Sequence, residues 1–522
     1  HEGSIAFRLT RPTVRGLLSP SAPVAIDLDR TRTARQPSSF MTRMKLYWQL
    51  KALGWAAAIL SCVASSPLAL AADQKPHIVH IVADDLGWKD LSCYGAPFNE
   101  TPNIDRLATQ SLRFTQAYTA GSVCSPTRSS IMTGKYPVRT GVTDYIPGLT
   151  SEGHKLVTQR TKTELALEEV TIGEAMREGG YQTFYSGKWH LGAKGFEPDA
   201  QGFEVYVGDH ELGNYSKDWS VGKRISESAV KFLDDHDQTR PFFMYLAFHE
   251  PHTPILEYPD HIAHFKEKAE GLPDATSTER PERQGITRTV QDDAAYGSEV
   301  AGLDSFVGTV LDKLQKQGLA DNTIVVFFSD NGGLSTKAAA GPTSNEPLRA
   351  GKGWLYEGGI RVPLIIRAPG LTKPGSITDV QVISTDFYPT LLELAGLPQR
   401  PQQHLDGVSI ASVLRDGTAP QRDALFWHYP HYHGSTWAPG SAMREGDWKL
   451  IEFFEENKVE LYNLKQDLSE QQDLSSAEPE RAKAMREKLT AWRQSTNAYV
   501  PQPGITPPTP KKGGKRKKAA EE

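Results

Sequence analysis

The chain has 522 residues, of which 38% are hydrophobic and 23% are charged, and its formal net charge at pH 7 is −5. This composition is typical of a globular protein with room for one large domain and a smaller one. The slight excess of acidic residues offers no basic surface to a polyanion, so we expect no nucleic-acid partner.

The N-terminal part of the chain has the layout of an export signal. Residues 41–72 begin with a short basic stretch, continue through the apolar run LGWAAAILSCVASSPLAL and end at the small-residue site ALAAD. This layout predicts a signal peptide cleaved near Ala71 or Ala72, a periplasmic or extracellular protein, and a mature chain with no transmembrane segment. A membrane or lipid anchor, the latter on Cys62, is the alternative. Residues 1–40 show no sustained apolar periodicity and are expected to be a non-native upstream segment.

Four short apolar runs, rich in β-branched and aromatic residues, are typical of buried strands. They are HIVHIVA (77–83), YQTFYS (181–186), PFFMYLAF (241–248) and TIVVFFS (323–329). Between them, TPNIDRLATQSLRFTQAY (101–118) predicts a helix with Thr101 as N-cap and Pro102 in its first position, and TIGEAMREGG (171–180) predicts a helix closed by glycines. Strands that alternate with helices predict an α/β fold, in which a large, mainly parallel sheet is sandwiched by helices.

The pattern changes near residue 420. ALFWHYPHYHG and SAMREGDWKLIEFFEENKVELYNL alternate in the manner of strands, and the helical pattern SAEPERAKAMREKLTAWRQ follows them. We therefore predict a smaller antiparallel sheet plus helix over 420–498, packed against a main domain over 75–418. Residues 499–522 are rich in proline and then in lysine, with little to bury, which predicts a disordered tail; attachment to an acidic surface is the functional alternative.

Polar side chains follow each of the four predicted strands. They are Asp84, Asp85, Lys188, His190, His249, His252, Asp330 and Asn331. Ligands of an open α/β sheet bind beyond the carboxyl ends of its strands, so we expect these groups to meet at one edge. The carboxylate and amide oxygens suit a hard divalent cation, Ca²⁺ with Mg²⁺ as the alternative. Such a cation, together with Arg128, Lys188 and Lys352, predicts a pocket for a compact anion.

Cys124 stands at the start of a helix that Ser125 and Pro126 are expected to open. Free N–H groups at a helix start attract negative charge, so a cysteine nucleophile is one interpretation. A thiolate beside a hard cation is a poor match, however, and an oxygen nucleophile would fit better. A disulfide between Cys93 and Cys124 is the structural alternative in an exported protein.

The run CSPTR (124–128), followed by TGKYPVRTG, resembles the signature of type I, formylglycine-dependent sulfatases, arylsulfatase-like members of the alkaline phosphatase superfamily. Further matches stand in the family's order along nearly all of the chain beyond the signal segment: VADDLGW, NETPNIDRLA, GKWHLG, HEPHTP, SDNGG, LRAGKGWLYEGGIRVPLI and REGDWKLI. The resemblance implies hydrolysis of sulfate monoesters. Thr127 departs from the smaller residue that the family more often has, which bears on how efficiently a maturating enzyme would process Cys124.

The resemblance also implies a role for each matching residue. A formylglycine-generating enzyme would convert Cys124, whose hydrated aldehyde would attack sulfur. The implied metal ligands are Asp84, Asp85, the modified Cys124, Asp330 and Asn331. His252 and Lys352 would protonate the leaving alcohol, and His190 would take the proton that releases the sulfate. Arg128 and Lys188 would orient the diol and neutralise developing charge.

The alcohol part of the substrate is expected to meet His249 and the C-terminal run WHYPHYHG. The candidate substrate-binding residues are His249, His428, His431 and Arg444. Aromatic faces beside hydrogen-bonding groups are common where sugars bind, which with export favours a sulfated saccharide over a small aryl sulfate. A hairpin that merely packs on the core is the alternative for the run. For the whole chain, the alternatives are a phosphonate or phosphodiester hydrolase of the same superfamily and a non-catalytic glycan-binding homologue.

Overall fold

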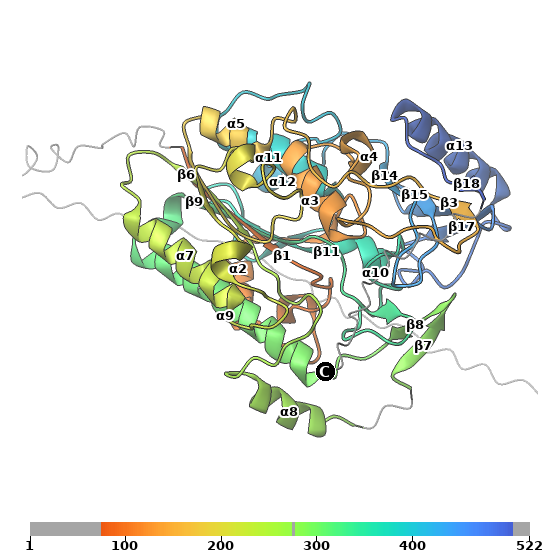
Figure 1. Ribbon diagram of the computed structural model, residues 1–522, viewed down its shortest axis with the longest axis horizontal. Coiled ribbons are helices and arrows are strands. Elements are labelled where there is room, and N and C mark those ends of the chain that lie inside the picture. The colour runs from red at the N-terminus through yellow and green to blue at the C-terminus, as the bar shows by residue number, and fades with distance from the viewer. Residues whose placement is uncertain (1–74, 274–276, 505–522) are drawn as a thin grey trace, which may run out of the picture. The chain divides into compact units, whose positions relative to one another are not determined.

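The computed structural model describes residues 75–273 and 277–504 (Figure 1). The predicted signal segment 41–72, the upstream residues 1–40 and most of the predicted tail therefore lie outside the described residues. Within the described ranges, no helix is both long enough and apolar enough to cross a membrane.

A mixed, mainly parallel sheet forms the centre of the fold. Across the described residues it has nine strands in the order β12-β2-β11-β9-β1-β6-β4-β5, with β13 also beside β2. The strands are β1 (His77–Ala83), β2 (Leu112–Tyr118), β4 (Gln182–Gly187), β5 (Val205–Val207), β6 (Phe242–Ala247), β9 (Thr323–Ser329), β11 (Arg361–Arg367), β12 (Ser376–Thr378) and β13 (Val382–Ile383). Strands β9, β1, β6, β4 and β5 run parallel, whereas β11 is antiparallel to both of its neighbours. The predicted strands and the predicted sheet type are confirmed.

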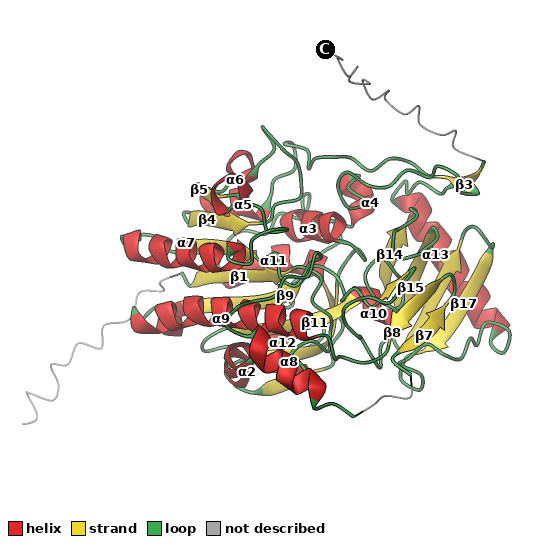
Figure 2. Ribbon diagram, turned by 60° about the horizontal axis from the view of Figure 1, so that its bottom comes forward, coloured by secondary structure: helices red, strands yellow, loops and turns green. Residues whose placement is uncertain are grey.

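Helices cover both faces of this sheet (Figures 1 and 2). Helices α3 (Cys124–Thr133), α5 (Ile172–Glu178), α11 (Phe387–Leu394) and α12 (Ala411–Asp416) pack on one face. Helices α2 (Pro102–Thr109), α7 (Val221–Asp235) and α9 (Ala294–Lys316) pack on the other. In β1, Ile78 and Val82 join the first core while Val79 and Ile81 join the second. Burial on both faces is the reason that this strand is apolar throughout.

The prediction of one helix over 101–118 is wrong for its second half, because α2 ends at Thr109 and strand β2 follows. In β2, Leu112 and Phe114 are buried and pair with β11, whereas Arg113 is partly exposed. The side chains therefore alternate with a period of two, which marks a strand. No glycine or proline separates the two elements, so the sequence gives little sign of the break.

A second, antiparallel sheet lies beside the first and carries one long helix. It consists of β14 (Leu425–Tyr429), β15 (Gly440–Glu445), β16 (Trp448–Phe453) and β17 (Lys458–Asn463), and α13 (Pro479–Ser495) packs against it. The predicted smaller sheet plus helix is confirmed. Its tryptophans Trp427 and Trp437 share an apolar core with Trp354 and Tyr356, which precede β11.

The remaining elements are short apart from one peripheral helix. They are α4 (Pro137–Thr140), α6 (Asp209–Leu212), α8 (Ile262–Glu270), α10 (Glu357–Ile360), β3 (Leu156–Val157), β7 (Glu279–Glu282), β8 (Gly285–Arg288), β10 (Thr336–Lys337) and β18 (Gln502–Pro503). Strand β18 pairs with β3, and the backbone carbonyl of Tyr499 accepts a hydrogen bond from His428. The prediction of disorder from residue 499 is thus wrong for 499–504, because backbone pairing orders a segment that has few apolar side chains.

Candidate active site

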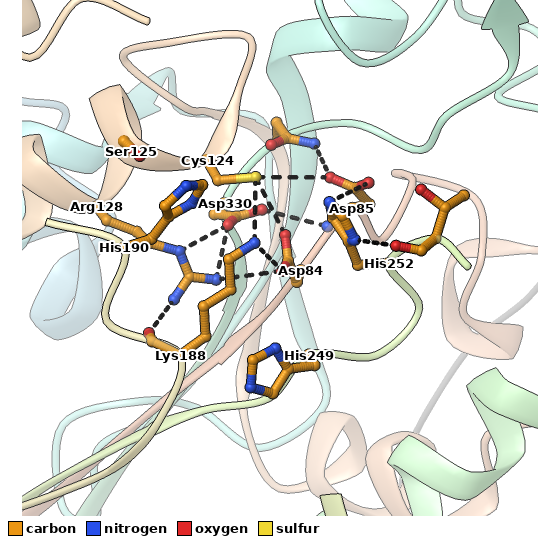
Figure 3. Close-up of polar contacts among 12 residues, drawn as sticks. Asp84, Asp85, Cys124, Ser125, Arg128, Lys188, His190, His249, His252 and Asp330 are labelled. Carbon is orange, nitrogen blue, oxygen red and sulfur yellow. Dashed lines mark hydrogen bonds and ion pairs between the residues drawn. The ribbon is translucent and has the colours of Figure 1, made fainter. Parts of the chain in front are cut away.

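The oxygen-bearing side chains after β1 and β9 lie at one edge of the sheet, as predicted. Ala83 and Ser329 are paired in adjacent parallel strands, so the residues after them emerge side by side. The Asp85 N–H donates to Asp330 Oδ1 at 3.2 Å, and Asn331 Nδ2 donates to Asp85 Oδ1 at 2.8 Å (Figure 3). These bonds hold Asp85 in the left-handed region, at φ 64°, a conformation that costs backbone energy.

Cys124, the first residue of α3, faces these carboxylates. Its Sγ lies 3.3 Å from Asp84 Oδ1 and 3.6 Å from Lys188 Nζ (Figure 3). Lys352 Nζ also lies 3.6 Å from this sulfur. Burial raises the pKa of the thiol, with Asp330 and Asp84 adding to the effect and the two lysines opposing it only in part. The unmodified residue is therefore a neutral thiol at pH 7, which argues against a thiolate nucleophile.

Neither cysteine of the described part of the chain forms a disulfide. Cys93 and Cys124 are both free thiols. Cys93 lies after β1, where its N–H donates to Asp105 and its carbonyl accepts from Arg113. The alternative of a Cys93–Cys124 disulfide is therefore wrong in this structure.

Arg128 and Lys188 bring buried positive charge to the same edge. Arg128 Nε donates to Asp330 Oδ2 at 2.9 Å, and its Nη1 donates to the Lys188 carbonyl at 2.8 Å. Lys188 Nζ contacts Asp84 Oδ2, and this carboxylate raises the pKa of the lysine despite its burial. Gly187, the residue before Lys188, has a φ of 105°, and a Cβ there would overlap the carbonyl of Ala247 in β6. Only glycine therefore fits at this position. Both cations thus keep their charge at neutral pH.

The donor set fits a hard divalent cation. Ligand atoms of Asp84, Asp85, Cys124 and His252 all lie within 4.8 Å of one another. Asn331 Oδ1 is buried with no hydrogen-bond partner, which is costly unless a cation completes it. Burial and the nearby Asp84 raise the pKa of Asp330 to about 7, and a divalent ion among these carboxylates would relieve that repulsion. Carboxylate and amide oxygens are the ligands that Ca²⁺ and Mg²⁺ prefer.

Two histidines in this site each have one unprotonated ring nitrogen. His190 Nε2 lies 2.6 Å from the Ile146 carbonyl, which can only accept, so Nε2 carries the proton and the buried, unpartnered Nδ1 carries none. His252 Nδ1 donates in the same way to the Thr253 carbonyl at 2.6 Å, which leaves Nε2 bare and 3.8 Å from Asp85 Oδ2. Burial lowers the pKa of both imidazoles, that of His252 to about 4 with Lys352 contributing.

Lys352 keeps its proton, unlike these two histidines. Its Nζ contacts both carboxylate oxygens of Asp85, at 2.7 and 2.8 Å. Asp85 is the main cause that raises the pKa of this ammonium against the effect of burial. At pH 7, Lys352 is charged and His252 is neutral, although they approach the same carboxylate.

A cavity of about 810 Å³ opens onto Cys124. The predicted residues Lys188, His190, His249, His252 and Lys352 line it, together with residues that sequence reasoning missed: Tyr145, Tyr206, Asp209, Tyr215 and His433. His249 is held there from two sides, because its Nε2 lies 3.2 Å from Asp209 Oδ1 and its ring stacks on Tyr215 at 4.3 Å between centroids. Among the missed residues, Tyr206 lies in β5, Asp209 begins α6 and the others come from loops, and no pattern in the sequence marks them.

Three of the four predicted substrate-binding residues do not line this cavity, and their prediction is corrected here. His428 bonds Ser441 and Tyr499, and His431 bonds Thr143. Arg444 is buried against Tyr118 and Gln116. Each therefore holds the second sheet in place. From the same run, His433 reaches the cavity instead, because the loop after β14 turns its ring toward Lys352.

Comparisons with known proteins agree with this geometry. The family model described as Sulfatase matches residues 76–397, and the model described as N-sulphoglucosamine sulphohydrolase, C-terminal, matches 350–495. A sulfatase of Formosa agariphila is 33% identical, over 84% of this chain and 92% of its own length. Human arylsulfatase A is 33% identical over 70% and 72%, and human N-acetylgalactosamine-6-sulfatase is 27% identical over 82% and 87%.

Solved structures show the same architecture. Ps i-CgsB, crystallised in complex with k-i-k-neocarrahexaose, superposes with a TM-score of 0.67 at 27% identity, over 82% of this chain and 95% of that one. PsFucS1 sulfatase from Pseudoalteromonas sp. superposes with a TM-score of 0.61 at 22% identity, over 82% and 92%, and supports the fold alone. The shared fold is the alkaline phosphatase-like one, with a large mixed sheet between helices and a smaller antiparallel sheet.

Proposed function

Because the chain belongs to the sulfatase family and is a sulfuric ester hydrolase, we propose that it releases sulfate from a sulfated saccharide with Cys124 matured to formylglycine beside Ca²⁺. The observation that carries the proposal is the convergence of a neutral, buried Cys124 with Asp84 and the unpartnered Asn331 oxygen. Maturation makes a formylglycine-generating enzyme a partner. The signal segment 41–72 supports export to the periplasm or the cell exterior.

The residues around Cys124 divide the work between binding the ion and binding the anion. Asp84, Asp85, Asp330 and Asn331 would hold the ion together with residue 124. When present, the ion polarises a sulfate oxygen and the matured residue supplies an oxygen nucleophile. Arg128 and Lys188 keep positive charge at this point and neutralise the charge that develops on the sulfate oxygens.

Proton transfer falls to Lys352, His252 and His190. Lys352 is charged at pH 7 and donates toward the leaving oxygen, while a bound sulfate anion raises the pKa of His252 and lets it share this proton. His190 presents the bare Nδ1 that a base needs, held in place by the bond from Nε2 to Ile146. His190 therefore takes the proton that releases the sulfate.

A saccharide fits the cavity better than a compact aryl group. About 810 Å³ exceeds what one sulfated ring needs, and the walls combine Tyr145 and Tyr215 with the polar groups of Asp209 and His433. Two of the similar proteins bear names that refer to sugars, N-acetylgalactosamine-6-sulfatase and the complex with k-i-k-neocarrahexaose. These features together favour a sulfated saccharide as the substrate.

Sulfate release tests this function directly. The full chain, produced with a maturating enzyme, is expected to release sulfate from carrageenan or chondroitin sulfate oligosaccharides with Ca²⁺ and to lose that activity after chelation, with Mg²⁺ compared in the add-back. Cys124→Ala is expected to lower kcat by at least about 10³-fold, because the nucleophile is gone. Dominant turnover of phosphonate or phosphate diesters would replace the proposal by the hydrolase alternative. Polysaccharide binding without sulfate release would replace it by the glycan-binding one.

A further inference from the structure

A second cavity adjoins the catalytic one. Its volume is about 400 Å³, and it shares His433 and Gly434 with the larger cavity. Its wall includes His154 and Lys155 from the loop before β3, Tyr432 from the loop after β14 and Glu455 from the loop after β16. A ligand that extends past His433 therefore passes directly from the catalytic cavity into this second space.

The second cavity contains a fixed aromatic platform. The exposed His154 ring stacks on Tyr432, with 3.7 Å between centroids and 14° between planes. Tyr432 is 7% exposed, its hydroxyl donates to Glu455 Oε1 at 2.9 Å, and it accepts from the Leu156 N–H at 3.2 Å. The buried tyrosine thus holds an exposed imidazole flat at the cavity wall. Such a surface packs well against the apolar face of a sugar ring.

The charge of the second cavity differs from that of the first. Lys155 Nζ lies 3.6 Å from Glu455 Oε2, so the local cation is balanced by a carboxylate. The catalytic cavity, in contrast, gathers the charged Lys188 and Lys352 around Cys124. The first space therefore suits a sulfate group, and the second suits a ring held by stacking and hydroxyl contacts.

His433 supplies a donor at the junction of the two cavities. Its Nδ1 accepts from the Ser435 N–H at 3.1 Å, so the neutral ring carries its proton on Nε2. Burial keeps the ring neutral. Gly353 makes room for this ring, since at φ 84° a Cβ there would overlap Nδ1 of His433. The junction thus offers an N–H where two linked sugars would share an oxygen.

We propose that the second cavity is a sugar subsite, which binds the residue next to the sulfated one, so that the substrate is an oligosaccharide or polysaccharide rather than a free sulfated monosaccharide. This inference rests on the proposed function, because the sulfated ring must occupy the catalytic cavity. The His154–Tyr432 platform binds the face of the neighbouring ring, and His433 bonds the linkage.

The test compares long and short substrates in variants of the full chain. For His154→Ala, kcat/KM on the hexasaccharides of carrageenan and chondroitin sulfate is expected to fall about three- to tenfold more than on 4-nitrocatechol sulfate, the loss expected for one aromatic contact. His154→Tyr keeps a flat ring and is expected to restore most of the hexasaccharide activity. His264→Ala, which removes an exposed imidazole bonded to Glu100, is the matched control and is expected to change neither rate. Equal losses on long and short substrates, or no loss, would overturn the subsite.

A binding measurement separates failure of the subsite from failure of the proposed function. Calorimetry with the same hexasaccharides on Cys124→Ala, with and without His154→Ala, reports binding in the absence of turnover. Weaker binding of the double variant by about three- to tenfold supports the subsite even if the wild-type chain released no sulfate, which would reject the proposed function alone. Equal binding by the two proteins, or no binding of either hexasaccharide, would overturn the subsite.

Discussion

At the scale of single residues, protonation states support the proposed assignment of the proton transfers to individual side chains. Lys352 and His252 both lie near Asp85, yet burial and neighbouring charge leave the amine charged and the imidazole neutral. The residue with the higher ordinary pKa is thus the better proton donor at pH 7. The sequence alone could not predict which of the two residues is protonated, because their protonation states depend on contacts that only the folded chain makes.

Replacement of Lys352 by alanine tests this assignment. We expect kcat at pH 7 to fall about 10²- to 10⁴-fold for a sugar sulfate, and much less for 4-nitrophenyl sulfate, whose leaving group needs no proton. Steady-state kinetics on both substrates measure the difference, with the exposed Lys223→Ala as the matched control. Equal losses on both substrates would mean that Lys352 acts through its charge rather than through its proton.

The candidate site was largely predictable from the sequence, residue by residue, where a strand end fixes the position. Asp84, Asp330 and Lys188 follow strands whose parallel register brings them to one edge. His433 was missed because three imidazoles stand within one short run, and the loop after β14 decides which one reaches the cavity. No periodicity in the sequence carries that information.

At the scale of elements, the segment around β14 is held by histidines that are buried in neutral form. Burial lowers the pKa of His428 to about 4 and that of His431 to about 3. Both rings bond oxygen partners, Ser441 and Thr143, and neither is more than 7% exposed. These residues thus stabilise the second sheet through buried hydrogen bonds.

This arrangement predicts that the protein loses stability as the solution becomes acidic. The unfolded chain takes up protons on these histidines below about pH 6.5, whereas the folded chain resists protonation down to about pH 4 or 3. Stability is therefore fully present above pH 6.5 and falls between pH 6.5 and 4, by up to about 1.4 kcal/mol per pH unit for each histidine. Urea unfolding at several pH values measures this slope.

The variant His431→Gln isolates one of these contributions. Glutamine keeps a donor for Thr143 but does not titrate, so we expect a shallower dependence of the unfolding free energy on pH than in the wild type. The exposed His264→Gln is the matched control. A slope unchanged from that of the wild type would contradict the buried, neutral state of His431.

The elements themselves were predictable to different degrees. The central strands are continuous apolar runs, because both of their faces are buried, and the sequence marks them clearly. Strand β2 was hidden because its alternating pattern follows α2 without a breaking residue. Strand β18 was hidden because backbone pairing, which leaves no mark in side-chain patterns, fixes it.

At the scale of the whole molecule, a buried ionic cluster joins the two sheets. Lys449 of β16 is fully buried, and its Nζ lies 2.9 Å from a carboxylate oxygen of Glu357 and 2.9 Å from one of Glu470. Glu357 begins α10, which leads into β11 of the central sheet, and its N–H donates to Glu470. The positive charges of Lys449, Arg444 and Arg361 hold the pKa of Glu357 low despite its burial. The second sheet, and with it His433, is thereby fixed relative to the catalytic edge.

Loss of the central cation of this cluster is expected to destabilise the protein strongly. Lys449→Met removes the ammonium that the buried carboxylates of Glu357 and Glu470 share, at a cost of about 3–5 kcal/mol in unfolding free energy. Lys458→Met on the neighbouring strand removes a half-exposed lysine that pairs with Glu460 and Asp473, and is expected to change stability by no more than about 0.5 kcal/mol. Chemical denaturation compares the two, and similar stabilities would show that the cluster does not hold the sheets together.

The central claim is that Cys124 is a precursor of the nucleophile, and the mass of one peptide tests it most directly. Trypsin releases Phe114–Arg128, which contains Cys124, from protein made in its own host. The account predicts a peptide that carries an aldehyde in place of the thiol, in a sample that releases sulfate. An unmodified cysteine in a sample that still releases sulfate at full rate would contradict it.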